Sequence, residues 1–308
     1  MKKIITFFAV AFLVSVLLIL FAASKSKPVP KAESGKIIIT ASFYPLAEFA
    51  KKVGGDFVEV VNITPAGVEA HDYEPTPRDI AVIRASKIFI YQGAGFDPWA
   101  ERVAQDLKDT DIKVVNMTDN FDLKKISTGD NIIKDPHIWL DPVLAQKEVN
   151  VIRDAIKEVY PEQSKVFIKN AETFNTALVE LDASIRAGLK KCQLAEIIVS
   201  HQAFGYFAER YGLRVTAISG ISPEEEPSAQ HLGEVAKLAK DKNIKVIFFE
   251  TLVSPKLAET VAREAGLNTS VLNPLEGLTN EEISAGKDYL SVMTTNLHNM
   301  QQALQCRN

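Results

Sequence analysis

Residues 160–191, YPEQSKVFIKNAETFNTALVELDASIRAGLKK, have the pattern of one long helix. Its apolar side chains recur at steps of three or four and so share one side of a helix: Phe167, Ala171, Phe174, Leu178, Leu181, Ile185 and Leu189. Pro161 suits the first turn. At 1.5 Å per residue such a helix spans roughly 45 Å, far more than a crossover between neighbouring strands needs. We therefore predict a rigid connecting helix that joins two lobes and packs along both.

Strand and helix patterns alternate on both sides of this helix. The first half has β-branched-rich runs at residues 36–42, 57–64, 87–93 and 112–118, and helical patterns at 45–53, 76–85 and 98–107. The second half repeats this order, with strands expected at 195–200, 214–219, 244–250 and 269–272, and helices at 204–211, 228–240 and 255–265. One last helix is expected over 283–304. The alternation predicts an α/β fold of two similar lobes, each a parallel β-sheet covered by helices, with a cleft between them.

These patterns divide the chain into an N-terminal lobe at 36–142, a helical segment that includes the connecting helix at 143–191, and a C-terminal lobe at 192–308. Residues 1–24 carry Lys2 and Lys3 before an apolar run, which is the layout of an export signal, and residues 25–35 have the composition of a flexible tether. The run is also long enough to cross a bilayer, so a retained anchor stays an alternative to a cleaved signal. We expect an exported protein, in the periplasm or at the outer face of the cytoplasmic membrane.

Composition excludes some classes of function. With 46% hydrophobic and 24% charged residues the chain is an ordinary globular one. A formal charge of -4 and the lack of a basic tract argue against nucleic-acid binding. The two cysteines, Cys192 and Cys306, form no C-x-x-C motif, which argues against a cysteine metal site. Whether they form a disulfide is open at this point, because sequence does not give their separation in space.

Three of the five histidines stand at the carboxyl ends of predicted strands. His71 follows the second strand of the first lobe, His137 follows its fourth strand, and His201 ends the first strand of the second lobe. In open parallel sheets ligands bind at this edge. The other two, His231 and His298, lie within predicted amphipathic helices, where a packed or solvated histidine is the usual case. His71, His137 and His201 are therefore candidate metal ligands from both lobes.

Glu276, in VLNPLEGL just beyond the last strand, is placed to supply a fourth ligand. Three neutral imidazoles and one carboxylate form a nitrogen-rich set that suits Zn²⁺ better than Ca²⁺ or Mg²⁺. Asp72 and Glu250 are placed to accept the second ring N–H of a ligating histidine, which would fix its orientation.

Six longer motifs carry a resemblance to a known family: ASFYPLAEFAKKVGGD (41–56), HDYEPTPRD (71–79), HIWLDPVLAQKEVN (137–150), SHQAFGYFAERYGL (200–213), ISGISPEEEPSA (218–229) and VLNPLEGLT (271–279). Through them the chain resembles the solute-binding proteins of bacterial ABC uptake systems for zinc and manganese, the cluster A-I type with two lobes joined by a rigid helix. The resemblance implies that His71, His137 and His201 are metal ligands, with Glu276 as the fourth in the zinc-importing branch.

The same resemblance implies a monomer that captures Zn²⁺ and delivers it to a membrane permease with its ATPase. A manganese-type member would carry a carboxylate where this chain has His201, so Zn²⁺ is expected and Mn²⁺ is the alternative. The chain departs from many zinc members in two ways. Residues 120–134 contain no histidine, where such members have an acidic, histidine-rich loop, and no cysteine ends the leader to accept a lipid.

Two other classes of function remain to be weighed. A zinc hydrolase binds its metal through three protein ligands and a water, in which case Glu276 would serve as the general base. The sequence has no H-E-x-x-H motif, and four protein ligands would leave no position for water. A structural adhesin or scaffold would not require ligands from both lobes. We therefore expect a carrier and not an enzyme.

Overall fold

The computed structural model describes residues 35–128 and 131–307. The predicted export signal at 1–24 and nearly all of the predicted tether at 25–35 lie outside these ranges. The described residues belong to one compact unit, 32–308, so the lobe limits given above stay a prediction. Among the helices of the described ranges, none is both long and apolar enough to cross a bilayer.

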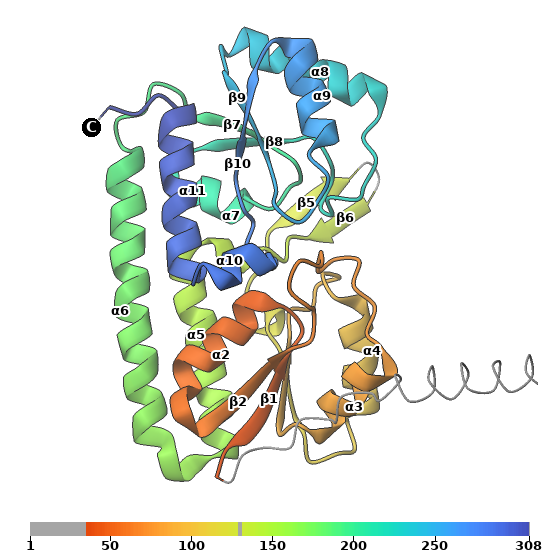
Figure 1. Cartoon of the computed structure of the whole chain (residues 1–308), viewed down its shortest axis with the longest axis vertical. Helices are drawn as coiled ribbons and strands as arrows, with labels where there is room; N and C mark the ends of the chain where they lie inside the picture. The colour runs from red at the N-terminus through yellow and green to blue at the C-terminus, as the bar shows by residue number, and fades with distance from the viewer. Residues whose placement is uncertain (1–34, 129–130, 308) are drawn as a thin grey trace, which may run out of the picture. The chain divides into compact units, whose positions relative to one another are not determined.

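The connecting helix is present as α6 (Ser164–Leu189), a helix of 26 residues that spans about 39 Å. Pro161 lies in a short 3₁₀ turn, η4 (Pro161–Gln163), that leads into it. All seven apolar residues of the predicted stripe are buried. They pack on α2 (Tyr44–Gly54), α5 (Pro142–Val159) and α11 (Tyr289–Ala303), and α6 runs beside both sheets (Figure 1). The connecting helix thus shares one hydrophobic core with both halves of the chain.

The first sheet has four parallel strands in the order β2-β1-β3-β4. The strands are β1 (Ile37–Ala41), β2 (Val58–Asn62), β3 (Ile88–Tyr91) and β4 (Lys113–Asn116). One face packs on α2 and α5, and the other packs on α3 (Pro77–Ala85) and α4 (Pro98–Asp106). Because both faces are covered, strand residues such as Ile88, Phe89 and Ile90 are buried in succession.

The second sheet repeats the topology of the first. It has the order β10-β9-β7-β8, with β7 (Glu196–Val199), β8 (Arg214–Ala217), β9 (Val246–Phe249) and β10 (Asn268–Val271) all parallel. The helices are α7 (Gly205–Tyr211), α8 (Ala229–Asp241) and α9 (Lys256–Ala265). Counted from its own first strand, each sheet has the order 2-1-3-4. The predicted α/β fold with two similar parallel sheets is therefore confirmed.

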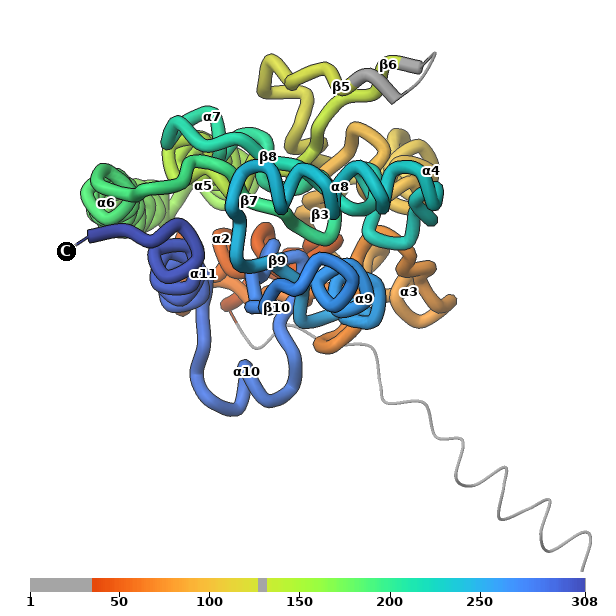
Figure 2. Tube along the Cα trace, turned by 90° about the horizontal axis from the view of Figure 1, so that it is seen from above, coloured from red at the N-terminus to blue at the C-terminus, as the bar shows by residue number. Residues whose placement is uncertain are grey.

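Two features differ from the prediction. An antiparallel hairpin, β5 (Lys125–Thr128) and β6 (Asn131–Lys134), was not expected; Figure 2 shows it on the opposite side of the molecule from α10 (Asn280–Ser284). The single helix predicted over 283–304 is wrong, because α10 and α11 are separate helices. Gly286 between them has a φ of +70°, and the Asp288 side chain accepts a hydrogen bond from the Ser291 N–H at 2.9 Å, which starts α11 anew.

Cys192 and Cys306 are paired in a disulfide that closes a sequence separation of 114 residues. Backbone hydrogen bonds reinforce this connection, since the Leu304 carbonyl accepts the N–H groups of Gln193 and Leu194 at 3.1 Å each. The end of the chain is thus attached to the segment between α6 and β7. This pairing leaves neither sulfur available to a metal ion.

Candidate metal centre

Each of four predicted side chains places one ligand atom within 4.8 Å of the others: His71, His137, His201 and Glu276. Glu276 Oε1 lies 3.1 Å from His201 Nε2, 3.5 Å from His71 Nε2 and 3.5 Å from His137 Nε2. A tetrahedral zinc ion with bonds of about 2.1 Å holds its ligand atoms roughly 3.4 Å apart. The three distances from Glu276 Oε1 therefore agree with the spacing around a tetrahedral ion.

Three of the four side chains come from loops that follow parallel strands, whereas His137 comes after the antiparallel β5–β6 hairpin and not directly after the fourth strand of the first sheet, as predicted. His71 lies in the loop after β2, and His137 precedes the short 3₁₀ turn η3 (Ile138–Leu140). His201 comes two residues after β7, and Glu276 lies in the loop after β10. Two candidates from the first half of the chain thus meet two from the second half, close to the carboxyl edges where parallel sheets bind ligands.

Two of the histidines are oriented by buried carboxylates. His201 Nδ1 lies 2.6 Å from Glu250 Oε1, and Glu250 follows β9 as the sequence suggested. His137 Nδ1 lies 2.9 Å from Asp135 Oδ1, and Asp135 was not predicted. Since a carboxylate accepts the Nδ1 proton in each case, the Nε2 lone pair of each ring is left for a ligand.

Asp72 was expected to orient a histidine, but within the described ranges no hydrogen bond joins its carboxylate to a ring. Instead its backbone N–H donates to Glu69 Oε2 at 3.2 Å, and the His71 N–H donates to Glu69 Oε1 at 3.1 Å. Sequence reasoning missed Glu69, which fixes this turn. The signal in the sequence is an acidic residue two positions before a histidine. Glu69 and Asp135 both have this position, and each accepts the backbone N–H of its histidine.

The charges of the cluster are strongly coupled. Burial opposes ionisation of Glu276, yet His201 and His71 hold its pKa well below the ordinary value. Burial also opposes protonation of His201, but Glu250 and Glu276 raise its pKa well above the ordinary value. For His71 burial prevails and lowers the pKa. Without a metal ion, the carboxylate is therefore ionised and His201 holds a proton that an arriving cation would displace.

Other side chains surround the four candidate ligands. Burial and the nearby Glu276 raise the pKa of Glu69 to about 8. The Phe96 ring packs on His71 with centroids 4.4 Å apart, and the Trp139 ring packs on His137 at 5.1 Å. Trp139 Nε1 also donates to the Pro274 carbonyl at 2.8 Å, which ties the loop of His137 to the loop of Glu276. Aromatic side chains thus shield the polar atoms from water.

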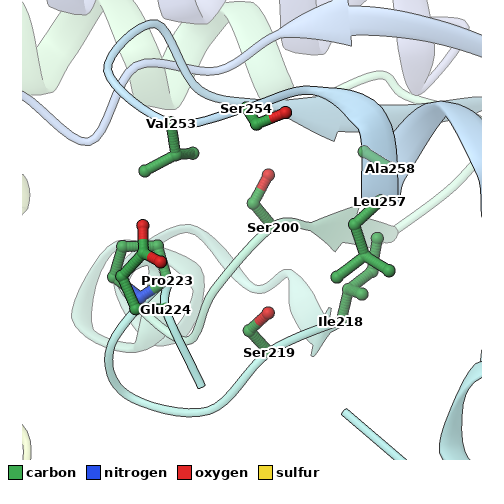
Figure 3. Close-up of a pocket in the computed structure, with 9 residues that line it drawn as sticks. All are labelled: Ser200, Ile218, Ser219, Pro223, Glu224, Val253, Ser254, Leu257 and Ala258. Carbon is green, nitrogen blue, oxygen red and sulfur yellow. The ribbon is translucent and has the colours of Figure 1, made fainter. Parts of the chain in front are cut away.

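A separate cavity of about 120 Å³ lies at the edge of the second sheet, lined in part by Ser200 and Ile218 (Figure 3). Its walls include the hydroxyl groups of Ser200, Ser219 and Ser254 and one carboxylate, that of Glu224. None of its lining residues is a histidine. The cavity therefore does not provide a second nitrogen-rich metal site.

The two remaining histidines lie away from this cluster. His231 Nε2 lies 2.9 Å from the Ala217 carbonyl oxygen, so α8 is anchored to β8 by this contact. His298 Nε2 lies 2.8 Å from the amide of Gln302, one turn further along α11. Both have the structural surroundings expected of histidines within helices.

Known proteins match nearly the whole chain. The family profile described as zinc-uptake complex component A, periplasmic (ZnuA) matches residues 39–303. The high-affinity zinc uptake system protein ZnuA of Bacillus subtilis is 36% identical over 307 residues, which cover 95% of this chain and 96% of that protein. The zinc-binding lipoprotein AdcA of Streptococcus pneumoniae is 38% identical over 283 residues, and these cover 88% of this chain but 56% of AdcA. This chain thus spans just over half of that longer relative.

A solved structure agrees with these matches. The Zn(II)-bound ZnuA-like domain of Streptococcus pneumoniae AdcA has a TM-score of 0.77 and 39% sequence identity, with 88% of this chain and 99% of that domain covered. The sequence profile, the relatives and the fold agree on one assignment, and the chain belongs to the ZnuA family of periplasmic zinc-uptake components.

Proposed function

We propose that this protein is the extracytoplasmic solute-binding component of an ABC importer, which captures Zn²⁺ and delivers it to a membrane permease. The observation that carries the proposal is the convergence of His71, His137, His201 and Glu276 from two sheets, with the carboxylate oxygen 3.1 to 3.5 Å from the imidazole nitrogens. Family membership supports it, because the matching Bacillus subtilis protein is named for high-affinity zinc uptake.

Capture follows from the chemistry of the four side chains. Three neutral imidazoles and one carboxylate leave a divalent ion with a net charge of +1 in a buried site. Binding requires His201 to lose its proton, so uptake of the cation and release of a proton are coupled. Because α6 is one continuous helix packed along both sheets, closure is a small shift of loops or lobes and not a wide hinge motion. Release follows when docking on the permease separates the two pairs of ligands.

The donor set also bears on the alternatives. Mn²⁺ prefers sites richer in oxygen, whereas this site offers three nitrogen atoms and one carboxylate. A hydrolase needs an open coordination position for water, whereas with Glu276 as the proposed fourth ligand no position would remain for water. We therefore propose a carrier that works as a monomer outside the cytoplasmic membrane, together with a permease and its ATPase.

X-ray absorption at the zinc edge of the metal-loaded protein tests this proposal. Four-coordinate zinc with three imidazole ligands and one oxygen ligand is expected, and Glu276→Ala should replace the carboxylate by an exchangeable water. A native spectrum that already contains a water ligand in place of Glu276 would favour the hydrolase. Competition between Zn²⁺ and Mn²⁺ in the same preparation should favour Zn²⁺, and a preference for Mn²⁺ would change the substrate.

A further inference from the structure

Helix α7 of the second half packs against the first-half segment that carries His137. This segment, residues 124–128 and 131–141, contacts α7 through Lys124, Asp135 and Asp141, whose partners are Gly205, Tyr206, Glu209 and Arg210. The same helix begins four residues after His201. Helix α7 is therefore close in sequence to the proposed ligand His201 and in contact with the segment that carries the proposed ligand His137.

Tyr206 makes the central contact. Its hydroxyl oxygen accepts the Lys124 N–H at 2.9 Å, and its O–H donates to the Asp135 carbonyl at 2.9 Å. Asp135 in turn holds His137, since its Oδ1 lies 2.9 Å from the ring Nδ1 and 3.0 Å from the backbone N–H. Tyr206 thus holds the backbone of Asp135, and the side chain of the same residue holds the ring of His137.

Gly205 lets the backbone of α7 approach the same carboxylate. A methyl group at this position would stand 2.8 Å from Asp135 Oδ2, closer than such contacts allow. Asp135 Oδ2 is buried and, within the structure described, has no hydrogen-bond partner. Since no hydrogen bond fixes Oδ2, we infer that the nearby backbone of Gly205 limits how far the carboxylate can rotate.

Ion pairs attach both ends of the segment to the same helix. Lys124 Nζ donates to the Gly205 carbonyl at 2.9 Å and pairs with Glu209. At the other end, Arg210 pairs with Asp141, whose side chain accepts the Val143 N–H at the start of α5. Movement of α7 therefore carries the segment around His137 with it.

We propose that Tyr206 and Gly205 are positioning residues for the metal site: through Asp135 they set the orientation of His137, and so they set how fast the bound cation leaves. This inference rests on the proposed function, because it assigns a role in zinc exchange. Partners that orient a ligating histidine typically contribute tenfold to a hundredfold in metal affinity. The geometry also couples a displacement of α7, in the second half, to a ligand in the first half.

Two variants test the proposal, and each has a matched control. Tyr206→Phe removes the hydroxyl, and Tyr211→Phe removes a hydroxyl of the same helix that donates to Asp182 of α6 at 2.9 Å and, in the part of the chain described, makes no hydrogen bond to the segment of His137. Gly205→Ala places a methyl group against Asp135. Gly233→Ala adds one within α8, where nothing lies within 4 Å. Alanine has a higher helix propensity than glycine, so Gly205→Ala should fold even if Tyr206→Phe does not.

Chelator competition measures the zinc affinity and the dissociation rate. The visible absorption of the Co²⁺ form reports the geometry of the ligands. Thermal unfolding of the metal-free protein reports its stability. Tyr206→Phe and Gly205→Ala should each weaken zinc binding about tenfold, mainly through faster dissociation, and should shift the Co²⁺ spectrum. The two controls should keep the wild-type affinity and spectrum.

Unchanged zinc affinity and Co²⁺ spectra in both test variants would overturn the inference while the wild-type protein still binds zinc tightly, as the proposed function requires. A loss of affinity that merely follows a loss of stability, with the Co²⁺ spectrum unchanged, would also overturn it. Failure of the wild-type protein to bind zinc would instead refute the proposed function itself.

Discussion

Replacing Glu250 by glutamine removes the negative charge behind His201 and keeps the size of the side chain. Glu250 is 4% exposed, and its Oε1 lies 2.6 Å from His201 Nδ1. A charged acceptor makes the imidazole a stronger electron donor to a metal at Nε2. Loss of such a partner typically weakens metal binding tenfold to a hundredfold, which corresponds to about 1.4–2.7 kcal/mol. We expect a loss of that size for Glu250→Gln in zinc affinity.

The expected loss depends on pH in a defined direction. Burial opposes protonation of His201, but Glu250 is the main group that raises its pKa well above the ordinary value. The carboxylate thus strengthens binding of the competing proton as well as of the metal. In the variant the proton binds more weakly, so less free energy is needed to displace it at low pH. The gap in zinc affinity between wild type and Glu250→Gln should therefore be largest at high pH and shrink as the pH falls.

Competitive titration with a zinc chelator between about pH 8.5 and pH 6 measures this gap across the titration range of histidine. Glu259→Gln serves as the control, because Glu259 is an exposed carboxylate on α9 and should leave zinc affinity unchanged. Wild-type affinity in Glu250→Gln at every pH would refute the orienting role of Glu250. A gap that widens toward low pH would refute the electrostatic reasoning.

Three more predictions concern the wild-type site and the core. Burial opposes protonation of His137 and His201, but Asp135, Glu250 and Glu276 outweigh it and raise the pKa values of these histidines. Zinc affinity should therefore already fall as the pH drops toward about 6.5. Flat affinity across this range would contradict the histidine site. Glu148 is fully buried in α5, both its oxygens have no hydrogen-bond partner in the ranges described, and burial raises its pKa well above the ordinary value. The folded protein thus keeps a proton that the unfolded chain loses as the pH rises, so Glu148→Gln should raise the free energy of unfolding by about 1–3 kcal/mol near pH 8 and by less near pH 5; urea titration at both pH values checks the sign. Replacing Cys192 and Cys306 together by serine opens a loop of 114 residues and should lower the free energy of unfolding by up to about 5 kcal/mol with zinc affinity unchanged, and equal urea midpoints for the two proteins would contradict this.

Local patterns predict much of this fold because each depends on neighbouring residues. The stripe on α6 follows from helical periodicity, and all of its members are buried. The strands follow from short β-branched runs bounded by turns, and residues at their carboxyl ends meet because parallel strands share one edge. His71, His201 and Glu276 each follow a strand of a parallel sheet, which is why their positions in the sequence group them. His137 follows the β5–β6 hairpin, and the structure brings it to the same cluster. Their role as ligands stays a prediction until metal binding is measured.

Features that depend on contacts distant in sequence were not predictable in the same way. Asp135 stands beside His137, but Tyr206 reaches it from 71 residues further along the chain. The β5–β6 hairpin was missed although its strands are as long as β3 and β4, because β5 has the sequence KIST with only one apolar residue. The break before α11 had a local indication, since Gly286 precedes Asp288, a residue that favours the start of a helix.

Zinc content by mass spectrometry, combined with competitive zinc titration of the wild-type protein, His201→Ala and Glu276→Ala, tests most directly whether the four side chains form one carrier site. We expect one tightly bound zinc ion per wild-type chain and clearly weaker binding in both variants, because each loses one proposed ligand atom from the second half of the chain. Wild-type zinc affinity in both variants would contradict a site that is shared between the two sheets.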